Sequence, residues 1–208
     1  MKKIAVSQRV VEAKGYHERR DALDQRWTDF LLSINAFPVL VPNNLDFLTP
    51  FLATEKIEGI LLTGGNSLSK YGGDAPERDA AEKALLEWAI SRNVPVLGVC
   101  RGMQLIQNYF GNQLEQVSGH VGKRHSLVVT RESKFSASLE KLDTVNSYHE
   151  FGSLDSTGDM LVSAKSEDGV IMAIEHAELD VYGVMWHSER EAPPVEEEKE
   201  IFQLVFSL

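Results

Sequence analysis

The segment at residues 94–104, VPVLGVCRGMQ, decides the fold of this chain of 208 residues. It begins as an apolar run with β-branched residues, which predicts a buried strand, and the residues after Cys100 suit a helix. Cys100 lies at the turn between the two, flanked by Gly98 and Gly102. This order predicts a nucleophile elbow, with the thiol exposed at the carboxyl end of a strand beside the free N–H groups of a helix.

A second apolar run, at residues 181–186, ends in His187-Ser188-Glu189. A cysteine nucleophile needs a base, and the base needs a partner that sets its tautomer. If the strand continued regularly, His187 and Glu189 would lie on one face, so that the carboxylate could reach the imidazole. A lone cysteine or histidine is also compatible with a structural role. Together, the two segments predict a catalytic triad of Cys100, His187 and Glu189.

Composition and charge limit the class of protein. The chain is 43% hydrophobic and 25% charged, with a formal net charge of −10. An acidic surface disfavours nucleic acid and anionic membranes as partners. The single cysteine excludes an internal disulfide and fits the reducing cytoplasm, and residues 1–9 contain too few apolar residues for a signal peptide. We expect one domain over residues 1–208, located in the cytoplasm, with no metal or other cofactor because no compact Cys/His cluster is evident.

Strand and helix patterns alternate in the first half of the chain. Apolar runs predict strands at 4–7, 37–42, 60–63 and 94–99, and three- and four-residue spacing predicts helices at 21–36 and 75–92. This alternation favours an α/β fold with a mainly parallel sheet between helices. From residue 126 onward the pattern predicts a small antiparallel β extension and a closing helix, from strands at 127–130, 161–164, 170–175 and 181–186 and from the apolar residues Ile201, Phe202 and Val205.

Four motifs resemble, in this order along the chain, those of the class I glutamine amidotransferase-like hydrolases. They are LLTGGNSLSKYGG (61–73), GVCRGMQ (98–104), VNSYHE (145–150) and WHSE (186–189). The residues in these motifs are most similar to those of the γ-glutamyl hydrolase branch, and the resemblance covers about residues 1–190. It implies a flavodoxin-like fold and cysteine-dependent hydrolysis of a γ-glutamyl amide through a γ-glutamyl thioester.

The resemblance also implies roles for individual residues. The amide of Gly65 or Gly64 and that of Arg101 would form the oxyanion hole. The glutamyl group would be bound by Gln104, Asn146, Ser147, Tyr148 and His149. Two departures weaken the transfer of roles: Glu150-Phe151 follows His149 where relatives commonly have His-Gln, and Ser67 stands where many have aspartate.

The expected loop at residues 8–26 is basic and includes Arg9, Arg19 and Arg20. Arginine suits phosphate, so we predict a leaving group that bears phosphate or pyrophosphate. One member of the wider group acts on γ-glutamyl-CDP-amidate during capsular phosphoramidate synthesis, and this is the specific substrate that we expect. Exposed arginines need no ligand, so a solvated surface is an equal alternative.

Other functions remain open from the sequence. The same triad could serve a glutaminase subunit that delivers ammonia to a synthetase, or a hydrolase of γ-glutamyl-polyamine or γ-glutamyl-GABA. A catalytically silent binding protein is a third class, against which the intact triad residues count. A homodimer is one assembly that the sequence leaves open.

Overall fold

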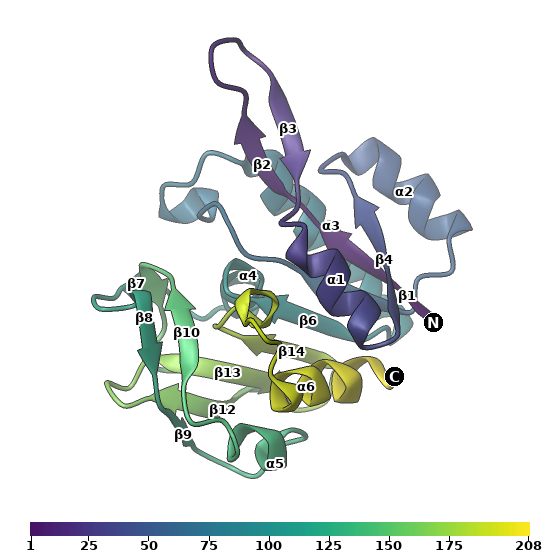
Figure 1. Cartoon of the computed structure of the whole chain (residues 1–208). Helices are drawn as coiled ribbons and strands as arrows, with labels where there is room; N and C mark the ends of the chain where they lie inside the picture. The colour runs from purple at the N-terminus through teal and green to yellow at the C-terminus, as the bar shows by residue number, and fades with distance from the viewer.

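The computed structural model describes all residues from 1 to 208. Eight strands form one sheet in the order β4-β1-β5-β6-β14-β13-β12-β9 (Figure 1). The first five are parallel: β4 (Ala36–Val41), β1 (Lys2–Ser7), β5 (Gly59–Leu62), β6 (Val96–Val99) and β14 (Val181–Val184). The other three continue the sheet antiparallel: β13 (Ile171–His176), β12 (Met160–Ser166) and β9 (Leu127–Val129). The predicted α/β fold with an antiparallel extension is therefore confirmed.

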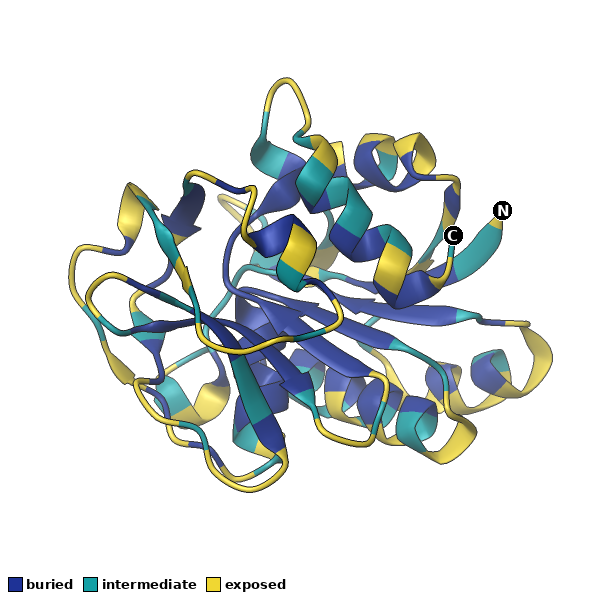
Figure 2. Ribbon diagram, turned by 90° about the horizontal axis from the view of Figure 1, so that it is seen from below, coloured by how far each residue is buried: buried dark blue, intermediate teal, exposed yellow.

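Helices cover both faces of the sheet, whose central strands are buried between them (Figure 2). On one face, α1 (Arg26–Ser33) meets α6 (Glu196–Phe206), where the rings of Phe30 and Phe202 are 4.8 Å apart. The other face carries α3 (Pro76–Arg92) and α4 (Arg101–Tyr109). The remaining helices are α2 (Leu45–Thr54), α5 (Ser136–Leu139) and the 3₁₀ turns η1 (Ser69–Tyr71) and η2 (Ser188–Arg190). None of the helices combines the length and apolarity needed to cross a bilayer.

Three two-stranded ribbons stand apart from the main sheet (Figure 1). They pair β2 (Arg9–Glu12) with β3 (Arg19–Ala22), β8 (Val121–His125) with β10 (Val145–Tyr148), and β7 (Glu115–Gln116) with β11 (Phe151–Gly152). Each ribbon contributes residues close to the carboxyl ends of the parallel strands, where open α/β sheets bind their ligands.

Two local expectations were wrong, and one helix was not predicted. Residues 8–26 are not a loop, because β2 and β3 pair as a hairpin in which Arg9 lies opposite Ala22. That pairing keeps residues 21 and 22 extended, so α1 begins at Arg26 rather than at residue 21. The helix α2 was missed, because Pro50 lies inside it and argues against a helix on propensity alone.

Cys100 joins β6 to α4 in a strained conformation, with φ 51° and ψ −103°. The two flanking glycines make this turn possible. A Cβ on Gly102 would lie 2.1 Å from the carbonyl oxygen of Leu62, and a Cβ on Gly98 would lie 2.5 Å from the backbone carbon of Gly102. The start of α4 can therefore approach β5 and β6 only because these two positions have no side chain.

We predict that Gly102→Ala destabilises the protein by about 3 kcal/mol, because the new methyl group would overlap backbone atoms that cannot move away easily. Urea denaturation measures the change. The matched control is Gly111→Ala, where a Cβ meets nothing within 4 Å and only the positive φ of 86° is costly. Equal losses in the two variants would contradict close packing at the elbow.

Candidate active site

The three residues of the predicted triad come together at the carboxyl ends of β6 and β14. Nδ1 of His187 lies 2.7 Å from Oε1 of Glu189, so the carboxylate accepts a hydrogen bond from this nitrogen and leaves Nε2 for another partner. Cys100 lies beside the imidazole: its Cβ and the Cε1–Nε2 edge of His187 both lie against Gly64, and both residues line one pocket. All three residues are buried, with Cys100 6% exposed.

The sequence had suggested that strand alternation would bring His187 and Glu189 together, but the contact between them arises in another way. The strand β14 ends at Val184, and the chain turns at η2, which brings the carboxylate back to the ring. Asn146 of β10 holds the turn: its Oδ1 accepts from the amide of His187 at 2.9 Å, and its Nδ2 donates to the carbonyl of the same residue at 2.9 Å.

The surroundings of His187 favour its charged form. Burial opposes protonation of the imidazole, but the hydrogen bonds and charges of Cys100 and Glu189 outweigh burial and raise the pKa of His187 to about 9. At neutral pH, therefore, the ring carries a proton on each nitrogen and can donate one of them.

The turn after β5 lies against this pair. A Cβ on Gly64 would lie 2.5 Å from Cε1 of His187 and 3.5 Å from Cβ of Cys100, so the glycine backbone is in contact with both. Neither Gly64 nor Gly65 donates its amide to another backbone group. The amide of Arg101, the first residue of α4, lies at a helix N-terminus, where amides lack a partner within the helix. These amides therefore have no backbone partner close to Cys100, and their role as an oxyanion hole stays a prediction.

A pocket opens over Cys100 and His187, and four of the residues predicted to bind substrate line it: Gln104, Tyr148, His149 and Arg9. Gln104 is fixed by donating to the carbonyl of Phe151 at 2.8 Å. Nδ1 of His149 also faces that carbonyl, at 2.9 Å. Burial and the nearby His120 lower the pKa of His149 to about 4, so the ring is neutral and its Nε2, which has no partner, is an acceptor.

Four other predicted substrate-binding residues do not line the pocket. Asn146 holds the backbone of His187 instead, and Ser147 is fully buried, with its hydroxyl on the carbonyl of His120 at 2.9 Å. Arg19 and Arg20 are also displaced from the expected role. Their guanidinium groups pair within the chain, that of Arg19 with Glu77 and Glu12 and that of Arg20 with Glu18.

The residue most clearly missed from the sequence is Arg190. It lines the pocket, stacks its guanidinium 4.4 Å from the centre of the Tyr148 ring, and lies 3.5 Å from Glu189. Its position directly after the His-x-Glu motif was the available signal. The other lining residues without a predicted binding role are Asn66, Ser67, Val121, Glu150 and Phe151.

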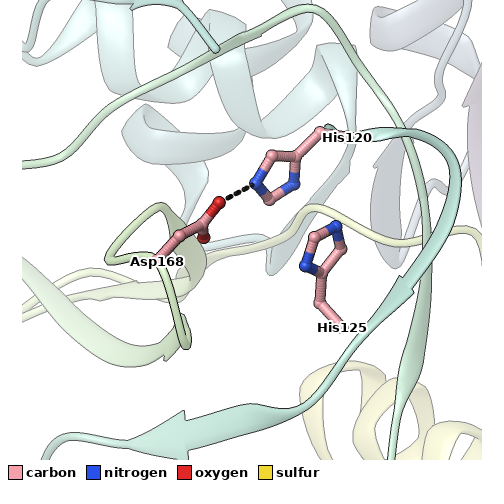
Figure 3. Close-up of side chains that lie close together, drawn as sticks. All are labelled: His120, His125 and Asp168. Atoms are coloured by element: carbon pink, nitrogen blue, oxygen red, sulfur yellow. Dashed lines mark hydrogen bonds and ion pairs between the residues drawn. The ribbon is translucent and has the colours of Figure 1, made fainter. Parts of the chain in front are cut away.

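The structure also gathers His120, His125 and Asp168, with donor atoms within 4.8 Å of one another, although no such cluster was expected (Figure 3). Both nitrogens of His120 already have partners, Ser147 at 3.1 Å and Asp168 at 3.0 Å. The rings of His120 and His125 stack at 4.1 Å with planes only 10° apart, so their in-plane lone pairs do not converge on one ion. This geometry fits a hydrogen-bonded link behind the pocket better than a metal centre.

Comparisons with known proteins agree with the fold and the motifs. The peptidase C26 family matches residues 4–189, so the chain belongs to this family of class I glutamine amidotransferase-like proteins. A γ-glutamyl-CDP-amidate hydrolase from Campylobacter jejuni is 32% identical over 192 residues, which cover 90% of each chain.

Two further relatives illustrate the breadth of the fold. A glutamine-hydrolysing GMP synthase from Dictyostelium discoideum is 30% identical over 166 residues, which are 75% of this chain and 22% of that protein. A glutamine amidotransferase from Thermotoga maritima, known from its crystal structure, superposes with a TM-score of 0.64 at 16% identity, over 97% of this chain and 82% of the other.

We predict that Glu189→Gln lowers the pKa of His187 from about 9, because burial opposes protonation and Cys100 then favours the charged ring without the help of the carboxylate. Ring ¹⁵N NMR, with signals assigned by their loss in His187→Ala, measures the titration. The control Glu196→Gln changes an exposed carboxylate on α6 and leaves the titration unchanged. The same titration in wild type and Glu189→Gln would contradict the assigned pair.

Proposed function

We propose that this protein is a stand-alone hydrolase of γ-glutamyl amides, acting in the cytoplasm, where reducing conditions keep its single thiol free. The observation that carries the proposal is the placement of Cys100 on a strained elbow, beside an imidazole whose Nδ1 is held by Glu189. This is the arrangement that acyl transfer from an amide requires.

In the acylation step, the sulfur of Cys100 forms a bond to the γ-carbonyl carbon, and the carbonyl oxygen becomes an oxyanion. Amides of the turn at Gly64 and Gly65 and of Arg101 stabilise this charge. When the carbon–nitrogen bond breaks, Nε2 of His187 gives its proton to the departing nitrogen, which leaves as a neutral amine or amidate.

In the deacylation step, the now neutral imidazole takes a proton from water, and the hydroxyl oxygen attacks the γ-glutamyl thioester. A second oxyanion forms at the same donors and collapses as the carbon–sulfur bond breaks. Glutamate leaves, and the sulfur and the imidazolium return to their starting states. Glu189 holds the ring in position throughout and stabilises its positive charge.

The glutamyl group would lie in the pocket between β8, β10 and the turn at residues 64–67. Glu150 is the one carboxylate among the lining residues and suits the α-ammonium group. Gln104 and the unpartnered Nε2 of His149 supply further polar contacts. These neutral and acidic groups favour a zwitterionic glutamyl group over an uncharged acyl chain.

For the leaving group, we propose a phosphate-bearing amine, with γ-glutamyl-CDP-amidate, the substrate named for the Campylobacter jejuni relative, as the specific candidate. The basic residues suited to a phosphate group are Arg9 and Arg190. Each of them lines both the pocket over Cys100 and a second hollow beside it, and His187 lines both as well. The guanidinium of Arg9 lies 3.0 Å from the position of a Cβ on Gly65, at the mouth of the site. Unlike Arg19 and Arg20, Arg9 has no carboxylate partner, so its charge is available.

The rival function is a glutaminase that supplies ammonia to a synthetase, and the resemblance to part of a GMP synthase supports it. The two differ in a measurable way. A hydrolase releases glutamate by itself, whereas a glutaminase that serves a synthetase is slow until that partner binds. A γ-glutamyl-polyamine hydrolase would also act alone, but arginines would repel its cationic leaving group. A γ-glutamyl-GABA hydrolase could use the same arginines for the carboxylate of GABA, so kcat/KM decides between it and the phosphate-bearing substrate.

We predict that the purified protein releases glutamate from at least one γ-glutamyl amide without a partner. Comparison of kcat/KM for glutamine, γ-glutamyl-GABA, γ-glutamyl p-nitroanilide and γ-glutamyl-CDP-amidate identifies the substrate. Both Cys100→Ala and His187→Ala reduce kcat by about 10⁴-fold or more, because the nucleophile or its proton donor is lost. Full activity in Cys100→Ala would reject the mechanism, and slow hydrolysis of glutamine alone would favour the rival.

We predict that Arg9→Gln raises KM for γ-glutamyl-CDP-amidate by about 10-fold or more, the cost of one lost charged hydrogen bond. Glutamine and γ-glutamyl p-nitroanilide, which lack phosphate, keep their KM values. Arg19→Gln and Arg20→Gln are the matched controls, because these arginines are already paired within the chain. An equal effect on substrates with and without phosphate would refute a phosphate-binding role.

A further inference from the structure

The turn that carries Gly64 and Gly65 is held from behind by one buried arginine, Arg78 of α3, whose side chain is fully buried. Its Nη2 donates to the carbonyl of Thr63 at 2.7 Å and to that of Gly64 at 3.1 Å, and its Nη1 donates to the carbonyl of Gly65. One guanidinium therefore binds three consecutive carbonyl groups.

The planarity of the peptide bond turns this contact into a constraint on the amides. In a trans peptide the C=O and N–H groups point in opposite directions. Because Arg78 holds the carbonyls of Thr63 and Gly64 on the α3 side, the amides of Gly64 and Gly65 point to the opposite side, where both residues line the hollow beside His187.

The turn needs such a constraint because its two glycines allow more than one arrangement. Gly65 has a φ of 86°, and glycine crosses between positive and negative φ at little cost. Rotation of the peptide between Gly64 and Gly65 would direct a carbonyl, rather than an amide, toward Cys100. The hydrogen bond from Arg78 to the carbonyl of Gly64 opposes that rotation directly, and the bonds to the carbonyls of Thr63 and Gly65 hold the peptides on either side. Each bond comes from a charged donor and is therefore stronger than a bond between neutral groups.

Arg78 is itself fixed by a buried carboxylate that also reaches the elbow. Oε1 of Glu82 accepts from Nε of Arg78 at 2.8 Å and from the hydroxyl of Ser7 at 2.7 Å. The other oxygen of Glu82 binds Arg101, the residue directly after Cys100, and Asp79 pairs with the same guanidinium. The burial of Glu82 opposes its ionisation, but Arg101 and Arg78 outweigh burial and hold its pKa below the ordinary value. One carboxylate thus joins both sides of the expected oxyanion hole.

We propose that Arg78 is a positioning residue that sets the orientation of the peptides at residues 63–65, and that Glu82 couples this turn to Arg101. The oxyanion hole is then formed before substrate binds and needs no partner protein. The inference rests on the proposed hydrolase function, and it adds the reason why such an enzyme acts alone.

The test uses the double variant Arg78→Met/Glu82→Gln, which removes one positive and one negative charge together and so leaves no buried ion newly unpaired. Asp79 remains to pair with Arg101. The matched control is Lys83→Met, which removes an exposed cation from the same helix. Arg78→Lys keeps the charge but lacks the planar fork, so partial recovery of activity relative to the double variant is expected.

Two reactions of Cys100 separate positioning from a general structural role. Turnover of γ-glutamyl p-nitroanilide passes through an oxyanion, whereas alkylation by iodoacetamide does not. We expect kcat of the double variant to fall by about 10²-fold, with KM and the alkylation rate within about threefold of wild type. A kcat within threefold of wild type, or an equal loss of turnover and alkylation, would overturn the proposal.

A spectroscopic readout makes the result independent of the substrate. In ¹H–¹⁵N spectra, the amides of Gly64 and Gly65 should give single sharp signals in wild type and split or broadened signals in the double variant, as the peptide samples two orientations. Unchanged signals would contradict the role of Arg78. If wild type cleaves no γ-glutamyl amide while these signals still change, the proposed function fails and the positioning role remains.

Discussion

The conformation of Cys100 is the constraint on which the rest of this site depends. A non-glycine residue with a φ of 51° is unfavourable, and it persists because the amide of Cys100 is bound by the carbonyl of Val184 at 2.8 Å while α4 packs tightly on the sheet. This packing requires glycine at positions 98 and 102, where a side chain would overlap backbone atoms. The sulfur is thereby held at the point where β5, β6 and β14 end together.

The second feature of the site is a buried network of charges beneath it. Arg78, Arg101, Glu82 and Asp79 balance one another, with two positive and two negative groups on α3 and α4. Burying such groups is costly, and hydrophobic residues of similar size would often be as stable. These charged groups do what hydrophobic residues could not, because Arg78 of the network donates hydrogen bonds to the carbonyls of the turn beside Cys100.

The sequence predicted the features that local patterns encode. Apolar runs and helical spacing located most strands and helices, and the turn chemistry around Cys100 predicted the elbow. Residues in the basic segment were harder to assign, because an arginine has the same sequence signal whether it faces a ligand or an acidic neighbour. The hairpin β2–β3 directs Arg19 to Glu77 on α3, a partner 58 positions away that no local pattern relates to it. Arg9, in the same segment, lies over Gly65 at the pocket.

The whole site shows the same difference between what local sequence patterns encode and what contacts between distant segments decide. By itself, the sequence determined the parallel sheet, the cysteine at a strand end, and the histidine and glutamate that follow another strand, since each depends on residues adjacent in the chain. The tertiary structure decided which side chains meet. It turned η2 so that Glu189 reaches His187, drew Asn146 onto the backbone of that histidine, and brought Arg78 behind the glycine turn. These contacts join segments that are distant in sequence, and only the packing of helices on the sheet sets the distances between them.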